Sequence, residues 1–148
     1  MRVVLQVVTH ASVTIDSKVY SQINEGFLLL VGFEEGDNEE IVNKVMNKIV
    51  SLRLFADEQG KTNLAFTDIG GEILCISQFT LYADIKKGRR PSFINAMRPE
   101  RATKLYDYTI SYLKTLVPVV KQGIFGADMK VELLNNGPFT LMIDSKDL

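Results

Sequence analysis

The sequence contains a single cysteine, Cys75, and a single histidine, His10, in 148 residues. One cysteine excludes a disulfide within the chain and a zinc site made of several cysteines. One histidine excludes a metal site that needs several imidazoles from one chain. The phosphate-binding patterns GxxxxGK(S/T) and GxGxxG are also absent, so nothing supports a nucleoside triphosphate or dinucleotide site. We therefore expect a protein that uses no metal and no cofactor.

Long apolar segments are missing as well. The longest run, residues 27–33, is far shorter than the roughly 20 residues that a membrane-spanning helix needs. Arg2 and Gln6 interrupt the N-terminus too early for a signal peptide. These absences predict a cytoplasmic protein that does not associate with membranes. The length, with an apolar fraction of 46% and a charged fraction of 24%, predicts one folded domain over residues 1–148.

The charges are unevenly distributed. The net charge of −1 is not typical of a nucleic-acid-binding protein, but residues 84–104 alone carry a net +5 and the rest of the chain −6. A basic patch on an acidic body could contact a phosphate backbone. A solvated loop and helix face would explain the same charges. The basic residues closest together are Lys86, Lys87, Arg89 and Arg90.

The pattern of apolar residues predicts a mixture of strands and two helices. One helix begins at Asp37 or Asn38 as the N-cap and carries an apolar stripe through residues 41–50. The other begins at Pro99 and ends before Pro118. The predicted strands are 3–8, 12–15, 19–23, 27–32, 53–55, 72–77, 130–134 and 139–143. We expect an α/β fold: one compact domain whose sheet is mostly antiparallel, with both helices packed on one face.

Two short segments are candidates for function. Residues 77–81 (Ser77-Gln78-Phe79-Thr80-Leu81) place two hydroxyls, a carboxamide and a ring where a predicted strand gives way to a loop. Asn136-Gly137-Pro138 combines a strong hairpin signal with a proline that restricts the preceding glycine. The simpler interpretations are polar side chains that cap free backbone groups in the first segment, and a turn between the last two strands in the second.

These two segments resemble the hallmark motifs of the D-aminoacyl-tRNA deacylases, and the similarity extends along essentially the whole chain. Phe139 stands where many members have valine, and residues 63–66 differ from the more polar continuation common in the family. The resemblance implies the fold expected above, with barrel-like strands. Further segments that match the family are 2–6, 11–13, 53–57, 60–64, 88–93, 105–108 and 126–129.

The resemblance implies an enzyme that hydrolyses the ester bond of D-aminoacyl-tRNA, and of glycyl-tRNA mischarged on tRNA-Ala, as a proofreading step in translation. Phe125 would be a further residue of the pocket. Backbone N–H groups near Phe79 and Thr80 would stabilise the developing oxyanion, with help from the ribose hydroxyl of the tRNA. The residues that would hold the terminal adenosine and the ester are Ser77, Gln78, Phe79 and Thr80.

The resemblance further implies a homodimer with the active site at the subunit interface. Gly137 and Pro138 of one subunit, joined by a cis bond, would enter the site of the other. Their carbonyl groups would occupy the space that an L side chain needs, so only D residues and glycine would fit. The basic residues of the 84–104 segment become candidates for contacts with tRNA.

Three alternatives remain at this point. Thr80 could act as a nucleophile, although no base adjoins it in the sequence. The domain could bind tRNA without hydrolysis, although the polar groups of residues 77–81 argue against a pure scaffold. An esterase could use Cys75 and His10, but this requires a reactive thiolate inside the apolar segment 73–76.

Overall fold

The computed structural model describes all residues, 1–148, and its sheet is organised around one long central strand, β1. The first half of β1 pairs with β3 and its second half with β2, while β8 pairs with both halves along the opposite edge. These pairings are antiparallel, whereas β3–β6 and β6–β7 are parallel. The strands of this sheet are β1 (Arg2–Ile15), β2 (Lys18–Ile23), β3 (Gly26–Gly32), β6 (Glu72–Ser77), β7 (Val120–Gln122) and β8 (Lys130–Asp144).

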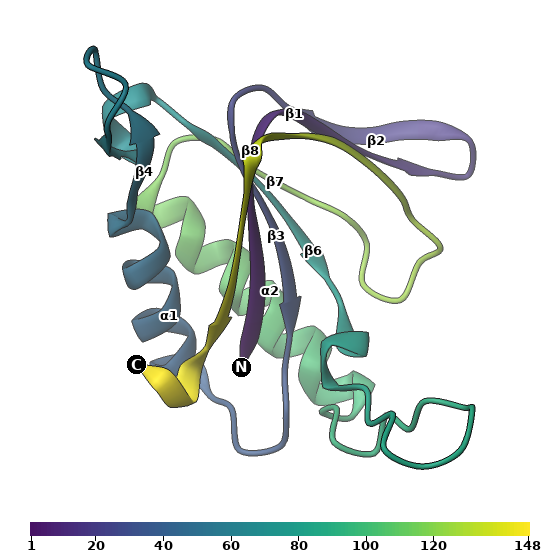
Figure 1. Ribbon diagram of the computed structural model, residues 1–148. Coiled ribbons are helices and arrows are strands. Elements are labelled where there is room, and N and C mark those ends of the chain that lie inside the picture. The colour runs from purple at the N-terminus through teal and green to yellow at the C-terminus, as the bar shows by residue number, and fades with distance from the viewer.

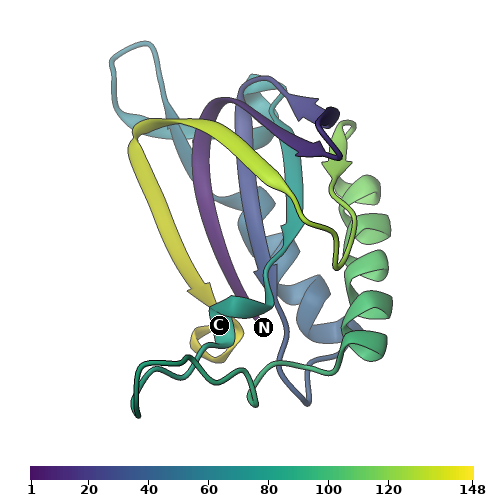
Figure 2. The ribbon, with the colours of Figure 1, turned by 90° about the vertical axis from the view of Figure 1, so that its right-hand side faces the viewer.

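The two longest strands differ from the sequence prediction, which divided each of them in two. β1 runs unbroken through the predicted gap between residues 8 and 12. The predicted turn between residues 134 and 139 is likewise wrong, because β8 continues through it in the same direction along β1. The turn signals of Asn136-Gly137-Pro138 instead produce a bulge within the strand, at which the strand pairing shifts register. At about the middle of its length β8 bends sharply, while still running antiparallel to β1 (Figure 2).

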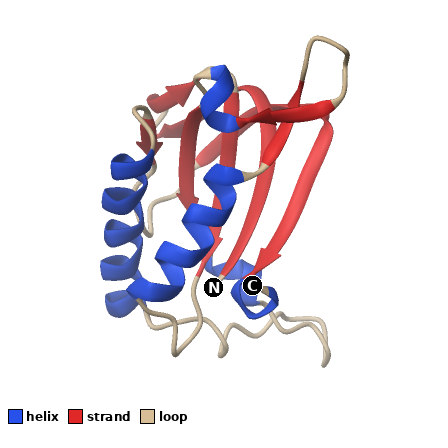
Figure 3. Cartoon of the chain, turned by 90° about the vertical axis from the view of Figure 1, so that its left-hand side faces the viewer, coloured by secondary structure: helices blue, strands red, loops and turns tan.

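The helices α1 (Glu39–Ser51) and α2 (Pro99–Leu116) cover one face of the sheet, as predicted (Figures 1 and 3). The side chain of Asn38 caps α1 by accepting the N–H of Ile41 at 3.0 Å. Asp37, the other predicted cap, makes different contacts, described below. The apolar stripe of α1 is buried at Val42, Val45, Met46 and Ile49. The main core therefore lies between the sheet and the two helices.

A second, smaller core lies on the opposite face of the sheet. It forms because the second half of β1, together with β2 and the first half of β8, folds over that face of β3 and β6 (Figure 2). This curvature makes the strands barrel-like. The buried residues of the second core are Val8, Ala11, Val13, Ile23, Leu28, Leu74 and Ile76.

Smaller elements complete the chain. β4 (Arg53–Ala56) and β5 (Thr62–Ala65) form a separate antiparallel hairpin at the end of α1. Three short 3₁₀ helices follow strands: η1 (Phe66–Ile69), η2 (Phe79–Tyr82) and η3 (Ser145–Asp147). Neither α1 nor α2 has the length and apolar character that crossing a membrane requires.

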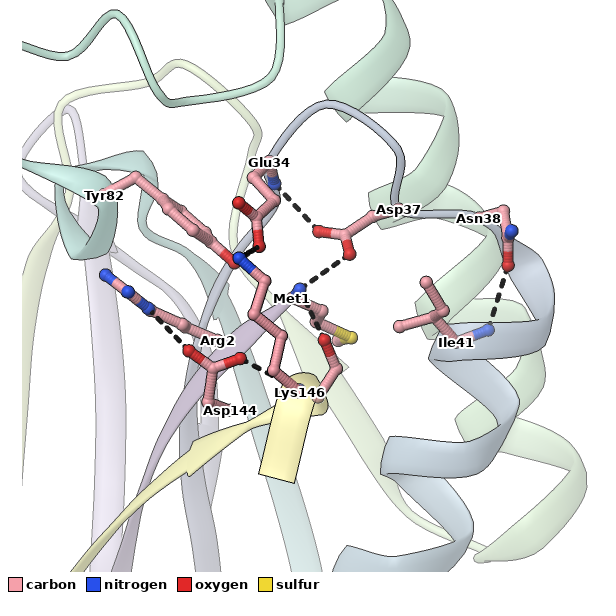
Figure 4. A network of polar contacts seen from close by, with 10 residues as sticks. Met1, Arg2, Glu34, Asp37, Asn38, Ile41, Tyr82, Asp144 and Lys146 are labelled. Atoms are coloured by element: carbon pink, nitrogen blue, oxygen red, sulfur yellow. Dashed lines mark hydrogen bonds and ion pairs between the residues drawn. The ribbon is translucent and has the colours of Figure 1, made fainter. Parts of the chain in front are cut away.

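A polar network joins the two ends of the chain to the loop before α1 (Figure 4). The α-amino group of Met1 is buried and donates to Asp37 Oδ1 at 2.6 Å and to Ser145 Oγ at 2.9 Å. The second carboxylate oxygen of Asp37 accepts the N–H of Glu34 at 2.8 Å. A buried charge is tolerated only when it is paired in this way. Asp37 therefore anchors the start of β1 rather than the start of α1.

Candidate functional site

A cavity of about 310 Å³ lies at the carboxyl end of β6. One wall consists of residues 76–79, where β6 passes into η2. The opposite wall consists of residues 125–129, from the connection between β7 and β8, together with Val131 of β8. The structure therefore brings together Ser77, Gln78 and Phe79 with Phe125, although 46 residues or more separate the two segments along the chain.

The pairing of β7 with β6 explains why these walls meet. Cys75 lies opposite Gln122 in parallel register, so the chain leaves β7 beside the end of β6. Gly123 follows at once, and a Cβ at this position would overlap the side chain of Met129. The absence of a Cβ therefore lets the connection lie close against the sheet without a shift of the Met129 side chain.

The first wall changes from buried to accessible along its length. Ile76 is buried, Ser77 and Gln78 are half-buried, and the Phe79 side chain is 53% exposed. The N–H of Gln78 still donates to Val31 O at 2.7 Å, and η2 begins directly afterwards. Phe79 and Thr80 are the first two residues of η2, so their N–H groups have no acceptor within that helix. Both N–H groups are therefore left to donate to an acceptor outside the helix.

Thr80 itself does not line the cavity. Its side chain is exposed, and its hydroxyl oxygen accepts a hydrogen bond from the Gln78 amide. Neither a carboxylate nor an imidazole is hydrogen-bonded to this hydroxyl. The arrangement gives Thr80 no general base that would activate it as a nucleophile.

The second wall is supported from α2. The ring of Phe125 is half-buried, and its centroid lies 6.0 Å from that of Tyr106. Tyr106 donates its hydroxyl to Cys75 O at 2.8 Å, and burial raises the pKa of this phenol still further above neutral pH. Tyr106 therefore fixes β6 and Phe125 relative to each other.

Gly137 and Pro138 lie outside the cavity of their own chain. They belong to the bulge of β8, where the four residues 136–139 stand opposite the single residue Val7. Both are exposed, the bond between them is cis, and Gly137 has a φ of +146°. The structure thus presents the pair at the surface, and does not join it to the residues 77–79 of the same chain.

The predicted basic residues lie on an exposed loop between η2 and α2. Two backbone hydrogen bonds between Asp84 and Ser92, of 2.8 and 2.9 Å, close the base of this loop. The loop cations are all unpaired, because none takes part in an ion pair. These loop cations also lie outside the cavity. They are Lys86, Lys87, Arg89 and Arg90.

Cys75 and His10 do not form a catalytic pair. The Cys75 side chain is fully buried in the main core, and burial raises the pKa of its thiol to about 12. The thiol is therefore protonated at neutral pH and inaccessible. His10 is exposed on β1, and its ring nitrogen lies 3.3 Å from Thr9 Oγ1. The esterase alternative has no support in this geometry.

Comparison with known proteins identifies the family of this chain. The family model described as D-Tyr-tRNA(Tyr) deacylase matches residues 4–144. The chain belongs to this family. A D-aminoacyl-tRNA deacylase of Lactobacillus delbrueckii subsp. bulgaricus is 54% identical over 144 residues, which cover 97% of this chain and 99% of that one. A D-aminoacyl-tRNA deacylase of Flavobacterium psychrophilum is 53% identical over 148 residues, covering 99% of each chain.

Solved structures show the same fold. The c-Myc DNA Unwinding Element Binding Protein superimposes with a TM-score of 0.92 at 37% identity, covering 97% of this chain and 98% of that one. A probable eukaryotic D-amino acid tRNA deacylase superimposes with a TM-score of 0.85 at 16% identity, covering 96% of this chain and 97% of that one. The predicted family and fold class are therefore confirmed.

Sequence reasoning missed two residues that shape this deacylase fold around the site. The prediction gave no role at the site to Tyr106, which lies in the family-like segment 105–108, or to Asn135, which lies in the predicted turn before Gly137. Asn135 accepts the N–H of Phe139 and donates to Thr140, so its side chain closes the bulge that carries Gly137. Asn is favoured where a side chain forms hydrogen bonds with nearby backbone groups that lack a partner. The residue type at position 135 was therefore the one signal in the sequence for this role.

Proposed function

We propose that this protein hydrolyses the ester bond of D-aminoacyl-tRNA and releases the free D-amino acid and tRNA. The observation that carries the proposal is the cavity between residues 76–79 and 125–129, with the first N–H groups of η2 beside it. This combination of a small pocket and backbone donors suits ester hydrolysis in a family whose relatives are D-aminoacyl-tRNA deacylases.

The chemistry needs little from the protein side chains. An aminoacyl ester is already activated, so the ester must mainly be oriented for attack by water. Ser77 and Gln78 supply polar groups at the half-buried end of the cavity, and Phe79 and Phe125 supply apolar walls. The N–H groups of Phe79 and Thr80 stabilise the oxyanion as it forms, and the neighbouring ribose hydroxyl helps to position the water. Thr80 contributes its backbone and not a nucleophilic hydroxyl.

Selection against L residues is assigned to Gly137 and Pro138 of a second copy of the chain. The exposed position of the bulge, away from the cavity of its own chain, supports this arrangement. In the homodimer, backbone carbonyls of the pair occupy the space that an L side chain would require. D residues and glycine fit, so glycyl-tRNA mischarged on tRNA-Ala is also a substrate. Exclusion by a steric clash spares the abundant L-aminoacyl-tRNA, as proofreading demands.

The basic loop of residues 86–90 is assigned the role of binding the phosphate backbone of the tRNA. Its cations are exposed and unpaired, so they are available to phosphates without loss of an internal ion pair. A cytoplasmic location, where aminoacyl-tRNA is used, remains a prediction from the sequence.

The proposal is tested by deacylation of one tRNA charged with the D or the L form of the same amino acid, and of glycyl-tRNA-Ala. We expect hydrolysis of the D ester and the glycyl ester, and an L ester that decays only at its spontaneous rate. Equal hydrolysis of both enantiomers would refute the chiral selection, and protection of every ester would indicate a binding module without hydrolysis.

A further inference from the structure

A second hollow, of about 490 Å³, adjoins the candidate active site and is not used by the mechanism above. We call it the apolar groove; it lies between the first residues of α2 and the second wall of the cavity, and residues 93–99 form most of it apart from Asn95. Phe79, Phe125 and Gly126 line both the groove and the cavity. The two hollows are therefore neighbours that share these three residues as a common wall.

The groove presents aromatic surface to solvent. Phe79 is 53% exposed and Phe93 is 38% exposed, and their ring centroids lie 4.9 Å apart at 70°. An edge-to-face pair covers only one face of one ring, so flat ring surface stays open for stacking. Ile94, which is 85% exposed, extends the apolar surface beyond the rings.

Positive charge borders this aromatic surface. Arg98 lines the groove, is exposed and takes part in no ion pair. The other basic residue at the start of α2, Arg101, is paired with Glu35. The basic loop of residues 86–90 leads directly into Phe93 along the chain. Exposed rings next to unpaired cations are the combination that binds single-stranded nucleic acid.

We infer that the apolar groove binds the nucleotide that precedes the terminal adenosine of the tRNA, within its unpaired 3′ end. This inference rests on the proposed function, with the terminal adenosine and its ester held at residues 77–79 of the cavity as the family resemblance implies. The preceding nucleotide must then leave the cavity, and the groove shares a wall with it. The base stacks on Phe93 and its phosphate lies near Arg98. Stacking does not depend on the identity of the base, so the groove binds the 3′ end of any tRNA.

The test compares binding of the trinucleotide CCA with binding of adenosine 5′-monophosphate, by calorimetry at fixed salt. We expect the wild-type protein to bind the trinucleotide more tightly. Phe93→Ala should weaken trinucleotide binding by about 5- to 150-fold, since a stacked base contributes about 1–3 kcal/mol. It should leave binding of the mononucleotide within error. Phe93→Tyr should restore the trinucleotide affinity, because it restores the flat ring.

Two further measurements complete the design. Tyr20→Ala removes another exposed ring, 50% exposed on β2 and outside both hollows, and should not affect trinucleotide binding. Arg98→Gln should lower the slope of log affinity against log salt by about 0.7, the value for one phosphate of a single strand. Equal affinity of wild type and Phe93→Ala for the trinucleotide would overturn the inference. So would a Phe93→Ala protein that dissociates into monomers, because the groove would then be a contact between copies.

These results are separable from the proposed function. If the wild-type protein fails to hydrolyse D-aminoacyl-tRNA, the proposed function fails, whatever the trinucleotide measurements give. If hydrolysis occurs but Phe93→Ala binds the trinucleotide normally, only the groove assignment fails.

Discussion

The side-chain oxygen of Asn135 accepts the backbone N–H of Phe139 at 2.9 Å, and so spans the bulge of β8 from one end to the other. The amide group of the same side chain donates to Thr140 Oγ1 at 2.8 Å. Phe139 packs against the main core, and Thr140 is within 3.3 Å of the Gln6 amide on β1. The three residues enclosed by this clamp, 136–138, are all exposed. One end of the Gly137–Pro138 tip is thus fixed to the core although the tip itself contacts solvent.

Asn135→Ala should therefore loosen the tip. Loss of both hydrogen bonds should lower the free energy of unfolding by about 1–2 kcal/mol and reduce deacylation of D-aminoacyl-tRNA. Asn135→Asp keeps the acceptor for Phe139 but not the donor to Thr140. Its stability and activity should therefore lie between those of the wild type and those of Asn135→Ala. Chemical denaturation and kcat/KM measure these effects. The control is Asn24→Ala, which removes an exposed side chain that makes no hydrogen bond and lies outside the tip. Wild-type stability and activity of Asn135→Ala would show that the clamp is unimportant.

Gly137→Ala should impair the enzyme more directly. A Cβ at residue 137 would lie 2.7 Å from the backbone nitrogen of Phe139, and the φ of +146° is one that L side chains rarely adopt. The tip must therefore shift, and we expect kcat/KM for the D ester to fall at least about tenfold, which corresponds to about 1.4 kcal/mol. No activity on the L ester should appear. Full activity of this variant on D-aminoacyl-tRNA would contradict the role given to the pair.

Thr80→Ala separates two mechanisms. If backbone groups stabilise the oxyanion, a substantial fraction of kcat should survive, because the N–H of residue 80 is retained. If the hydroxyl is the nucleophile, kcat should fall by several orders of magnitude, as loss of an attacking atom does in other hydrolases. Single-turnover deacylation measures the difference, and Thr80→Ser is the control that retains a hydroxyl. A folded Thr80→Ala protein with no activity would establish the covalent mechanism instead.

The core and the position of most elements could be predicted from the sequence because burial dictates periodicity. The stripe of α1 and the fully apolar β3 illustrate this. The bulge in β8 could not be predicted, since Asn136-Gly137-Pro138 has the same local preference in a turn as in a bulge. Only the pairing of both halves of β8 with β1 distinguishes them. Similarly, Asp37 and Asn38 are equivalent caps by type, and the buried amine of Met1 decides between them.

The candidate site was predictable only through family resemblance. Nothing in the spacing of residues 77–79 and Phe125 indicates that they meet. Their proximity depends on the parallel pairing of β6 with β7, a contact between segments far apart in the sequence. The groove at Phe93 could not be predicted from the sequence either. An aromatic residue next to a basic loop is common on protein surfaces, and only the fold places this one beside the cavity.

Neutralising the basic loop should weaken tRNA binding without changing the preference for D over L esters. Each cation that contacts a phosphate should contribute about 0.9 to the slope of log affinity against log salt. A salt titration of tRNA binding measures the slope, and an unchanged slope would show that the loop is only solvated surface. The variant carries glutamine at Lys86, Lys87, Arg89 and Arg90. The control carries glutamine at four exposed lysines elsewhere: Lys44, Lys48, Lys61 and Lys114.

Mixing two inactive variants tests most directly whether one copy of the chain completes the site of another. Ala127→Trp fills the cavity of its own chain, because Ala127 lines it, but leaves the tip of β8 intact. Gly137→Ala disturbs the tip but leaves the cavity open. Reassociation of the two in equal amounts should restore about a quarter of the wild-type D-aminoacyl-tRNA deacylation, since about half of the two-fold dimers are mixed and each has one intact site. A mixture as inactive as its components would contradict a site shared between subunits.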